Sequence, residues 1–292
     1  MATDTINPPP APQRVYYSTG RMLGVEDFQA DQDYHRSRLA RALVQLFGTG
    51  TVSGLLVQTD GNTDVTQLEI QVTPGMAIDR IGRIVDVPRL ICIVLNNWLT
   101  QTMQAWQNQQ ANPVPGQPAL PDPNTAIHSG NLVVDVFATF VSCTRGLTPC
   151  FASDDDYDAT DAFSANRLLD SFAMQLVLRT DATPLTPADP WKSGGALPAG
   201  GSGLTAPAIA TLQTLLLGAT AGSPAPAVEY PPGFDATSVY LARILIAATA
   251  GASGNPPTWD LTKMSIDNSS RLFVYPAALM ARLSGLGSGT ET

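Results

Sequence analysis

The densest group of potential metal ligands is the acidic run at residues 154–161. Three of its aspartates have the spacing of the first three ligands of an EF-hand calcium loop: Asp154, Asp156 and Asp158. That loop also requires a glycine at its sixth position and a bidentate acid at its twelfth, and these positions hold Ala159 and Ala165. The run is therefore interpreted as a solvated acidic loop, and no metal ligand is predicted.

The same run has a structural explanation. Residues 163–170 directly follow it and are compatible with a short helix. Asp161 or Ser164 would then lie near the helix start, where a side-chain oxygen accepts hydrogen bonds from the free amides of the first turn. The sequence thus predicts an acidic loop that caps a helix.

Histidine chemistry is limited, because the chain has only His35 and His128. They are distant in sequence and have no acid at ligand spacing, so a zinc site is not predicted. Each histidine is assigned a packing or capping role. Two histidines also leave few bases for a serine or cysteine hydrolase.

Motifs of established catalytic centres are absent from the sequence. There is no Gly-x-Ser-x-Gly, His-Glu-x-x-His, P-loop or Gly-x-Gly-x-x-Gly after a strand. Ser202 lies among three glycines, which is typical of a flexible loop rather than a nucleophile elbow. Two carboxylates that meet only in the fold, as in glycosidases, leave no mark in the spacing. We therefore expect no enzyme activity, no catalytic residue and no cofactor.

The three cysteines do not indicate a disulfide framework. Cys92 lies in an apolar run and is predicted to be a small buried side chain. Cys143 and Cys150 flank a glycine and a proline and could close a loop. Two reduced thiols in a chain made in the cytosol are the alternative that we favour.

Charge argues against nucleic acid as a partner. The chain has 16 basic and 25 acidic residues, a net charge of −9, and only 14% charged residues. No basic patch suited to phosphates is evident. The four tryptophans are scattered and do not alternate with basic residues, so no platform for single-stranded nucleic acid is predicted. They are Trp98, Trp106, Trp191 and Trp259.

Membrane insertion is also not expected. No apolar run reaches the roughly 18 residues that span a bilayer, and residues 1–12 have neither a basic nor an apolar segment of a signal peptide. We expect a protein made in the cytoplasm without a signal peptide.

One long helix is predicted near the N-terminus. Residues 26–47 contain no glycine or proline, and Gly48 and Gly50 follow them. Apolar or large residues recur at helical spacing: Phe28, His35, Leu39, Ala42, Leu43 and Leu46. We expect this face to pack on a sheet, in which case Leu39→Asp would unfold the helix–sheet unit.

The rest of the chain reads mainly as short strands and long loops. Turn signals separate β-branched runs, which predict strands at 52–57, 68–72, 77–78, 84–87, 90–95, 132–141, 172–178, 239–247 and 261–266. Further helices are predicted at 98–110, with Leu99, Met103 and Trp106 on one side, and at 205–217. Proline- and glycine-rich loops are predicted at 111–126, 181–203 and 218–235.

These elements predict an α+β protein: a β-rich body with one long N-terminal helix, short antiparallel strands and long Pro/Gly loops. Five segments follow along the chain. They are an extended arm at 1–14, a helix plus small antiparallel sheet at 15–97, a loop-rich insertion at 98–235 with strands and short helices, C-terminal strands that complete the body at 236–286, and a flexible tail at 287–292.

Residues 15–90 carry three distinctive motifs. They are Gly20-x-x-Leu23-x-x-x-Asp27-Phe28, then Gly48-x-Gly50-x-Val52-x-Gly54-Leu55-x-Val57, then Pro74-Gly75-x-Ala77-Ile78-Asp79-x-x-Gly82-Arg83. They resemble a module of phage tails and of phage-tail-like contractile injection systems. A later element is similar to one in the same proteins: Leu241-Ala242-Arg243-Ile244-Leu245-Ile246, followed by Ile266-Asp267-Asn268-x-x-Arg271.

The resemblance implies a structural subunit at the baseplate, fibre or periphery of such a particle, without identifying which. Its partners would be other subunits, namely baseplate, fibre, tube or sheath proteins, or further copies of itself. It would contact neither nucleic acid nor the membrane interior. Two alternatives stay open: a receptor- or carbohydrate-binding tail fibre module, and a particle-borne cell-wall glycan hydrolase that draws on the acidic run at 154–161.

Overall fold

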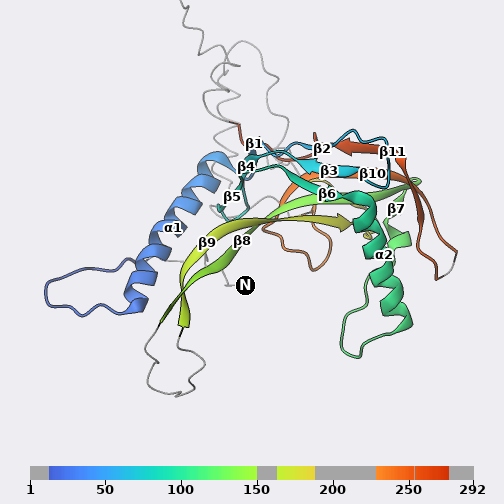
Figure 1. Cartoon of the computed structure of the whole chain (residues 1–292). Coiled ribbons are helices and arrows are strands. Elements are labelled where there is room, and N and C mark those ends of the chain that lie inside the picture. The colour runs from blue at the N-terminus through green and yellow to red at the C-terminus, as the bar shows by residue number, and fades with distance from the viewer. Residues whose placement is uncertain (1–12, 150–162, 188–227, 253, 276–292) are drawn as a thin grey trace, which may run out of the picture.

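The computed structural model describes residues 13–149, 163–187, 228–252 and 254–275. Within these ranges, helices and three antiparallel sheets are combined, which confirms the α+β class (Figure 1). Neither α-helix of the described ranges is apolar enough over a sufficient length to cross a bilayer. The sequence-predicted helix at 205–217, residues 1–12 of the predicted arm at 1–14, and the tail at 287–292 lie outside the described residues.

Two small sheets are built from the first hundred residues. One has the order β1 (Gly50–Gly54), β4 (Gly75–Ile78) and β5 (Ile84–Val87), and the other β2 (Val57–Thr59), β3 (Glu69–Val72) and β6 (Ile91–Val94). These strands lie within one or two residues of their predicted positions, except at 52–57.

The predicted strand at 52–57 is wrong, because the chain leaves one sheet and enters another there. Gly54 and Leu55 both have left-handed backbone, with φ of 61° and 54°. A side chain at Gly54 would lie 2.0 Å from the Pro74 carbonyl oxygen, so this corner requires glycine. The corner lets β1 and β2 belong to different sheets.

The largest sheet has β8 (Asn131–Pro149) at its centre. On one side β8 pairs with β10 (Val239–Thr249), which pairs with β11 (Thr258–Asp267). On its other side lie β7 (Ile127–His128) and β9 (Phe163–Leu178). The sheet therefore joins strands from 98–235 with strands from 236–286, and these strands share one hydrophobic core with the small sheets.

The helix predicted at 163–170 is wrong, because these residues form the first half of β9. They pair in register with the end of β8, from Pro149 opposite Phe163 to Ser142 opposite Asp170. This ladder supplies the backbone with hydrogen-bond partners that a weak helical pattern cannot outweigh. Ser164 consequently lies in a strand and does not cap a helix, and Asp161 is outside the described residues.

Helix α2 (Leu95–Ala111) packs on the core as the sequence predicts. Its buried residues are Leu95, Leu99, Met103 and Trp106, which fall on one face at intervals of three and four. The proline-rich stretch that follows ends in a short 3₁₀ helix, η1 (Pro123–Ala126). Asp122 caps it by accepting from the Asn124 amide at 2.9 Å.

Helix α1 (Val25–Phe47) extends away from the sheets (Figure 1). Its one buried residue is Ala40, which lies against the turn at Gly82. A side chain at Gly82 would lie 2.1 Å from the Ala40 carbonyl oxygen. Leu39 is 59% exposed and Leu46 is 74% exposed. The expectation that the Leu39 face packs on the sheet is therefore wrong, since the helix contacts the body through the Ala40 side instead.

The two helices should respond differently to the same substitution. Leu99→Ala should lower the free energy of unfolding by about 3 kcal/mol, because truncating a fully buried leucine removes apolar burial and leaves a cavity. Leu39→Ala should change it by less than about 0.5 kcal/mol. Urea unfolding followed by circular dichroism measures both values, and equal losses would contradict the exposed position of Leu39.

Candidate functional site

The residues that the sequence singled out for chemistry are not brought together in the described part of the chain. His35 lies exposed on α1, with its Nε2 atom 3.8 Å from Asp31 Oδ1. His128 lies on β7, and its Nε2 atom is 3.1 Å from the Arg179 carbonyl oxygen. The acidic run at 154–161, Cys150, Trp191 and Ser202 lie outside the described residues. The described ranges hold no cluster of three potential metal ligands.

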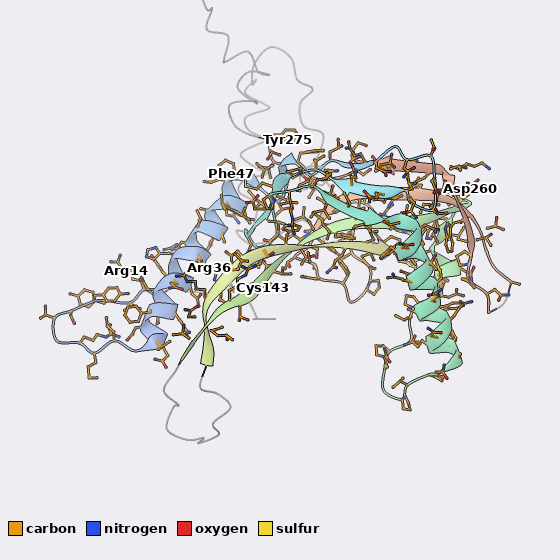
Figure 2. All side chains as sticks on the ribbon, viewed as in Figure 1. Arg14, Arg36, Phe47, Cys143, Asp260 and Tyr275 are labelled. Atoms are coloured by element: carbon orange, nitrogen blue, oxygen red, sulfur yellow. The ribbon has the colours of Figure 1, made fainter. Side chains whose placement is uncertain are left out.

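The prediction that Cys92 is buried is wrong. Cys92 is exposed on β6, because the alternation of the strand turns it outward. Desolvation and the neighbouring Glu69 carboxylate raise the pKa of its thiol, so the reactive thiolate is disfavoured at neutral pH. Cys143 is also a free, exposed thiol, and it lies on the β8–β9 pair (Figure 2).

The most buried charges meet in the large sheet around Asp135. Asp135 is fully buried in β8, directly opposite Arg243 of β10. Arg243 donates to both carboxylate oxygens, at 2.8 and 2.9 Å. Arg179, which follows β9 and is also fully buried, donates to the same carboxylate. One negative charge thus links three segments of the large sheet.

Arg179 and Arg243 extend this network into the neighbouring loops. Arg179 donates to both oxygens of Asp181, at 2.8 and 2.9 Å, and to the Glu229 carbonyl oxygen at 2.8 Å. Arg243 donates to the Pro184 carbonyl oxygen at 2.8 Å. Partial burial raises the pKa of Asp181, but the hydrogen bonds and charge of Arg179 outweigh this effect and hold the pKa below its usual range.

The sequence carries a signal for this network in the positions of its charged residues. Asp135 is the one charged residue in the apolar run at 132–141, and Arg243 is the one charged residue at 239–247. A single charge inside an apolar strand is costly to bury alone. Two apolar strands that each contain one charge, of opposite sign, therefore indicate an ion pair between neighbouring strands.

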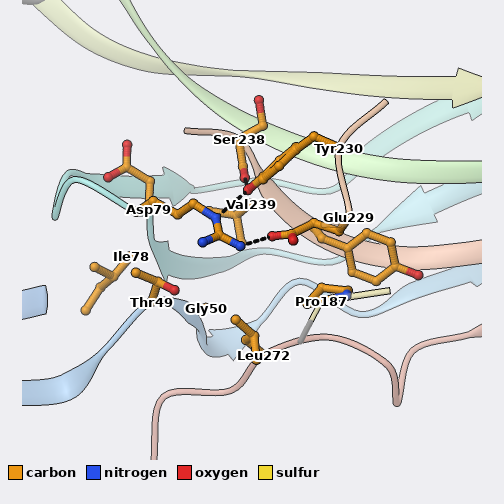
Figure 3. A pocket seen from close by; sticks show the side chains of 12 residues that line it. Thr49, Gly50, Ile78, Asp79, Pro187, Glu229, Tyr230, Ser238, Val239 and Leu272 are labelled. Atoms are coloured by element: carbon orange, nitrogen blue, oxygen red, sulfur yellow. Dashed lines mark hydrogen bonds and ion pairs between the residues drawn. The ribbon is translucent and has the colours of Figure 1, made fainter. Parts of the chain in front are cut away.

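A second buried network surrounds Arg80 (Figure 3). The Arg80 guanidinium forms an ion pair with Glu229 and donates to the Tyr230 hydroxyl at 3.1 Å. Tyr230 in turn donates to the Ser238 carbonyl oxygen. The Ser238 hydroxyl lies 2.7 Å from that of Thr139, on β8. This network ties the turn after β4 to the loop before β10.

The residues of the Asp79-x-x-Gly82-Arg83 motif stabilise the turn between β4 and β5. Asp79 Oδ1 accepts from the amides of Ile81 and Arg83, at 3.0 and 2.8 Å, and Asp79 Oδ2 accepts from Arg83 Nε at 2.6 Å. Burial raises the pKa of Asp79, and the Arg83 charge offsets this only in part. Each motif residue is therefore used to hold the turn against α1 and the sheet.

The Asn268-x-x-Arg271 motif closes the corner at Leu55. Asn268 accepts from the Val57 amide at 3.0 Å and donates to its carbonyl oxygen at 2.8 Å. Arg271 is buried and donates to the Leu55 carbonyl oxygen at 2.7 Å. Burial lowers the pKa of Arg271 to about 10, which leaves it charged at neutral pH. The segment at 55–57 and the segment at 268–271 are therefore in direct contact.

A cavity of about 20 Å³ lies beside the Arg80 network, between the β1 start and the β10 start. It is lined by Thr49, Gly50, Ile78, Asp79, Arg80, Pro187, Glu229, Tyr230, Ser238, Val239, Tyr240 and Leu272 (Figure 3). This volume accommodates about one water molecule and no organic substrate. Two carboxylates line the cavity: Glu229 is paired with Arg80, and Asp79 is paired with Arg83.

Two projections carry several exposed apolar residues. One is α1, and the other is the outer half of the β8–β9 pair, which we call the ribbon and define as residues 143–148 and 165–170. Every ribbon residue is exposed. Leu147 is 76% exposed and Leu168 is 60% exposed. Arg145 and Arg167 lie directly opposite each other across the two strands.

Compared with known proteins, the chain matches no family model and no curated protein sequence.

Asp135 should be essential for stability. Asp135→Asn should lower the free energy of unfolding by about 3 kcal/mol, because it leaves two arginines without their buried counter-charge. As a matched control, Asp260→Asn removes an exposed partner of Lys263, and its effect should be small. Urea unfolding of both variants tests this. An Asp135→Asn variant as stable as the control would contradict a central role for the Asp135 network.

Asp181 should contribute an acid-sensitive part of the stability. Its pKa is lower in the folded protein than in the unfolded chain, so it stabilises the fold above the unfolded pKa of about 3.9. This contribution is lost as the pH falls through the folded pKa. Thermal unfolding at pH 7 and pH 3 should therefore show a smaller fall in Tm for Asp181→Asn than for the wild type. Identical falls would contradict the pairing with Arg179.

Proposed function

We propose that the chain is a structural subunit of a contractile injection system or phage tail, at the baseplate, fibre or particle periphery. It acts through protein–protein contacts, without a cofactor, and its partners are other subunits of the particle. The observation that carries this proposal is the ribbon, an exposed two-stranded extension of a rigid sheet. The resemblance of residues 15–90 and 241–271 to proteins of such particles supports the same function.

The ribbon has little to stabilise it within one chain. A two-stranded hairpin is marginally stable in water, because it lacks an apolar face covered by further strands or a helix. The ribbon residues are exposed on both faces, including Leu147, Leu168 and Leu169. A partner that covers these leucines would add the missing layer and bury their apolar surface.

The charges of the ribbon indicate what kind of partner would cover it. Arg145 faces Arg167 at the same level of the ladder. Like charges directly opposite each other destabilise an antiparallel pair. A carboxylate from a partner between them would relieve this repulsion, and arginine is well suited to such contacts. We therefore expect a partner surface with apolar groups and at least one acid.

The ribbon is continuous with the buried part of the large sheet. β8 runs without interruption from the core into the ribbon, and the buried Asp135 network fixes its inner half to β10 and to the segment after β9. Contacts made at the ribbon are thus held at a defined place relative to the rest of the subunit.

The proposal predicts that the ribbon is needed for incorporation into particles. Leu147→Ser/Leu168→Ser should leave Tm unchanged within about 1 °C, since both side chains are exposed. The amount of this variant that sediments with sheath- and tube-bearing particles from the producing cells should be lower than that of the wild type by at least about tenfold. Val114→Ser, at an exposed position after α2, is the control.

Two results would contradict the proposed function. The wild-type chain could fail to sediment with any particle that electron microscopy identifies by its tube or sheath. Alternatively, the double variant could be incorporated as well as the control.

A further inference from the structure

Helix α1 carries a continuous seam of exposed residues at coiled-coil spacing. The seam residues are Val25, Phe28, Gln32, His35, Leu39, Ala42 and Leu46. The intervals alternate between three and four, which is the spacing of the a and d positions in a heptad repeat. All seven are exposed, so the seam has no cover within the described chain.

The seam faces away from the body. Ser37, Ala40 and Val44 are the more buried residues on the opposite side of the helix. At 100° per residue, their mean direction lies roughly 140° from that of the seam. Helix α1 also extends away from the sheets (Figure 1), and no described residue covers the seam.

The charges of α1 are divided between its two halves. The first half carries acids only: Glu26, Asp27, Asp31 and Asp33. The second half carries bases only: Arg36, Arg38 and Arg41. A parallel partner of the same sequence would place the acids of one helix beside the acids of the other. An antiparallel partner places each acidic half beside a basic half, which is favourable.

We propose that α1 pairs antiparallel with α1 of a second copy of this chain, forming a two-helix coiled coil with a twofold axis between residues 33 and 34. This inference rests on the proposed function, since it names one of the protein contacts through which the subunit acts. The helix that covers the seam is α1 of the second copy, because two antiparallel copies of α1 are complementary in both charge and side-chain type.

In this register apolar seam residues face apolar residues of the partner, and polar seam residues face polar ones. Phe28 of one copy lies against the partner's Leu39, and Val25 against the partner's Ala42. Gln32 lies against the partner's His35 beside the axis, so the two polar seam residues meet each other rather than an apolar side chain. Polar pairs at such positions select register and orientation. Asp31 faces the partner's Arg38 at the edge of the seam.

Shifting the helices by one heptad removes this match. The axis would then pass through residue 37, which places His35 against the partner's Leu39 and brings Arg38 close to the partner's Arg38. The proposed register avoids both conflicts. It also places the two bodies at opposite ends of the helix pair, because each helix contacts its own body through Ala40.

Cysteine pairing tests the orientation in the full chain, with Cys92, Cys143 and Cys150 changed to serine. Val25→Cys mixed with Ala42→Cys should give a disulfide-linked dimer under mild oxidation. Neither variant alone should cross-link, because two copies of residue 42 lie about 25 Å apart along an antiparallel pair, beyond disulfide reach. Cross-linking of each single variant with itself would overturn the proposal in favour of a parallel pair.

Charge exchange tests the register by sedimentation equilibrium. Asp31→Arg should weaken dimerisation about tenfold, because it turns two attractive pairs into repulsive ones. Asp31→Arg/Arg38→Asp should restore the wild-type dimer. Leu39→Asp should give a folded monomer with the far-UV circular dichroism spectrum of the wild type, since Leu39 is exposed in one copy. A double variant that stays as weak as Asp31→Arg would overturn the register.

The outcomes separate this inference from the proposed function. A wild-type chain that is monomeric at high concentration and does not cross-link, yet enters particles, overturns the paired helix and leaves the structural role standing. If Leu39→Asp also stops that monomer from entering particles, the seam binds a different subunit instead. A dimer that behaves as predicted but never sediments with particles supports the paired helix and contradicts the structural role.

Discussion

Asp135 lies in the inner half of β8, the longest strand, where its carboxylate has no contact with solvent. Such a charge is tolerable only with close counter-charges, and Arg179 and Arg243 supply them from neighbouring segments. Their remaining donors bind the loops around Pro184 and Glu229. Strand order, loop path and strand register are therefore coupled, because moving any of these segments would leave a buried charge without a partner.

The Asp79-x-x-Gly82-Arg83 and Asn268-x-x-Arg271 motifs also hold segments of the fold together. Asp79 and Arg83 hold a turn, Gly82 lets α1 approach it, and Asn268 and Arg271 close the corner between the small sheets. These residues make contacts within the chain. The exposed leucines of α1 and of the ribbon take no part in these contacts.

Elements that bury one regular face could be predicted from the sequence. In helix α2, the spacing of Leu99 and Met103 indicates the buried face, and the apolar residues of the small-sheet strands indicate theirs in the same way. The failures arose where distant contacts decided the outcome. The pairing of β9 with β8 overrode a weak helical pattern, and the left-handed corner at Gly54 depends on Pro74. The periodicity of α1 was recognised, but periodicity alone does not say whether an apolar face meets its own body.

The continuity of β8 has a mechanical consequence. Its backbone connects the ribbon tip to the core without an intervening loop, and its inner half is hydrogen-bonded to β10. These hydrogen bonds lie perpendicular to the strand. A pull on the ribbon along the strand therefore loads the ladder in shear, so that many bonds share the force and must yield together. Tension applied at the ribbon would thus be transmitted through β8 into the core of the chain.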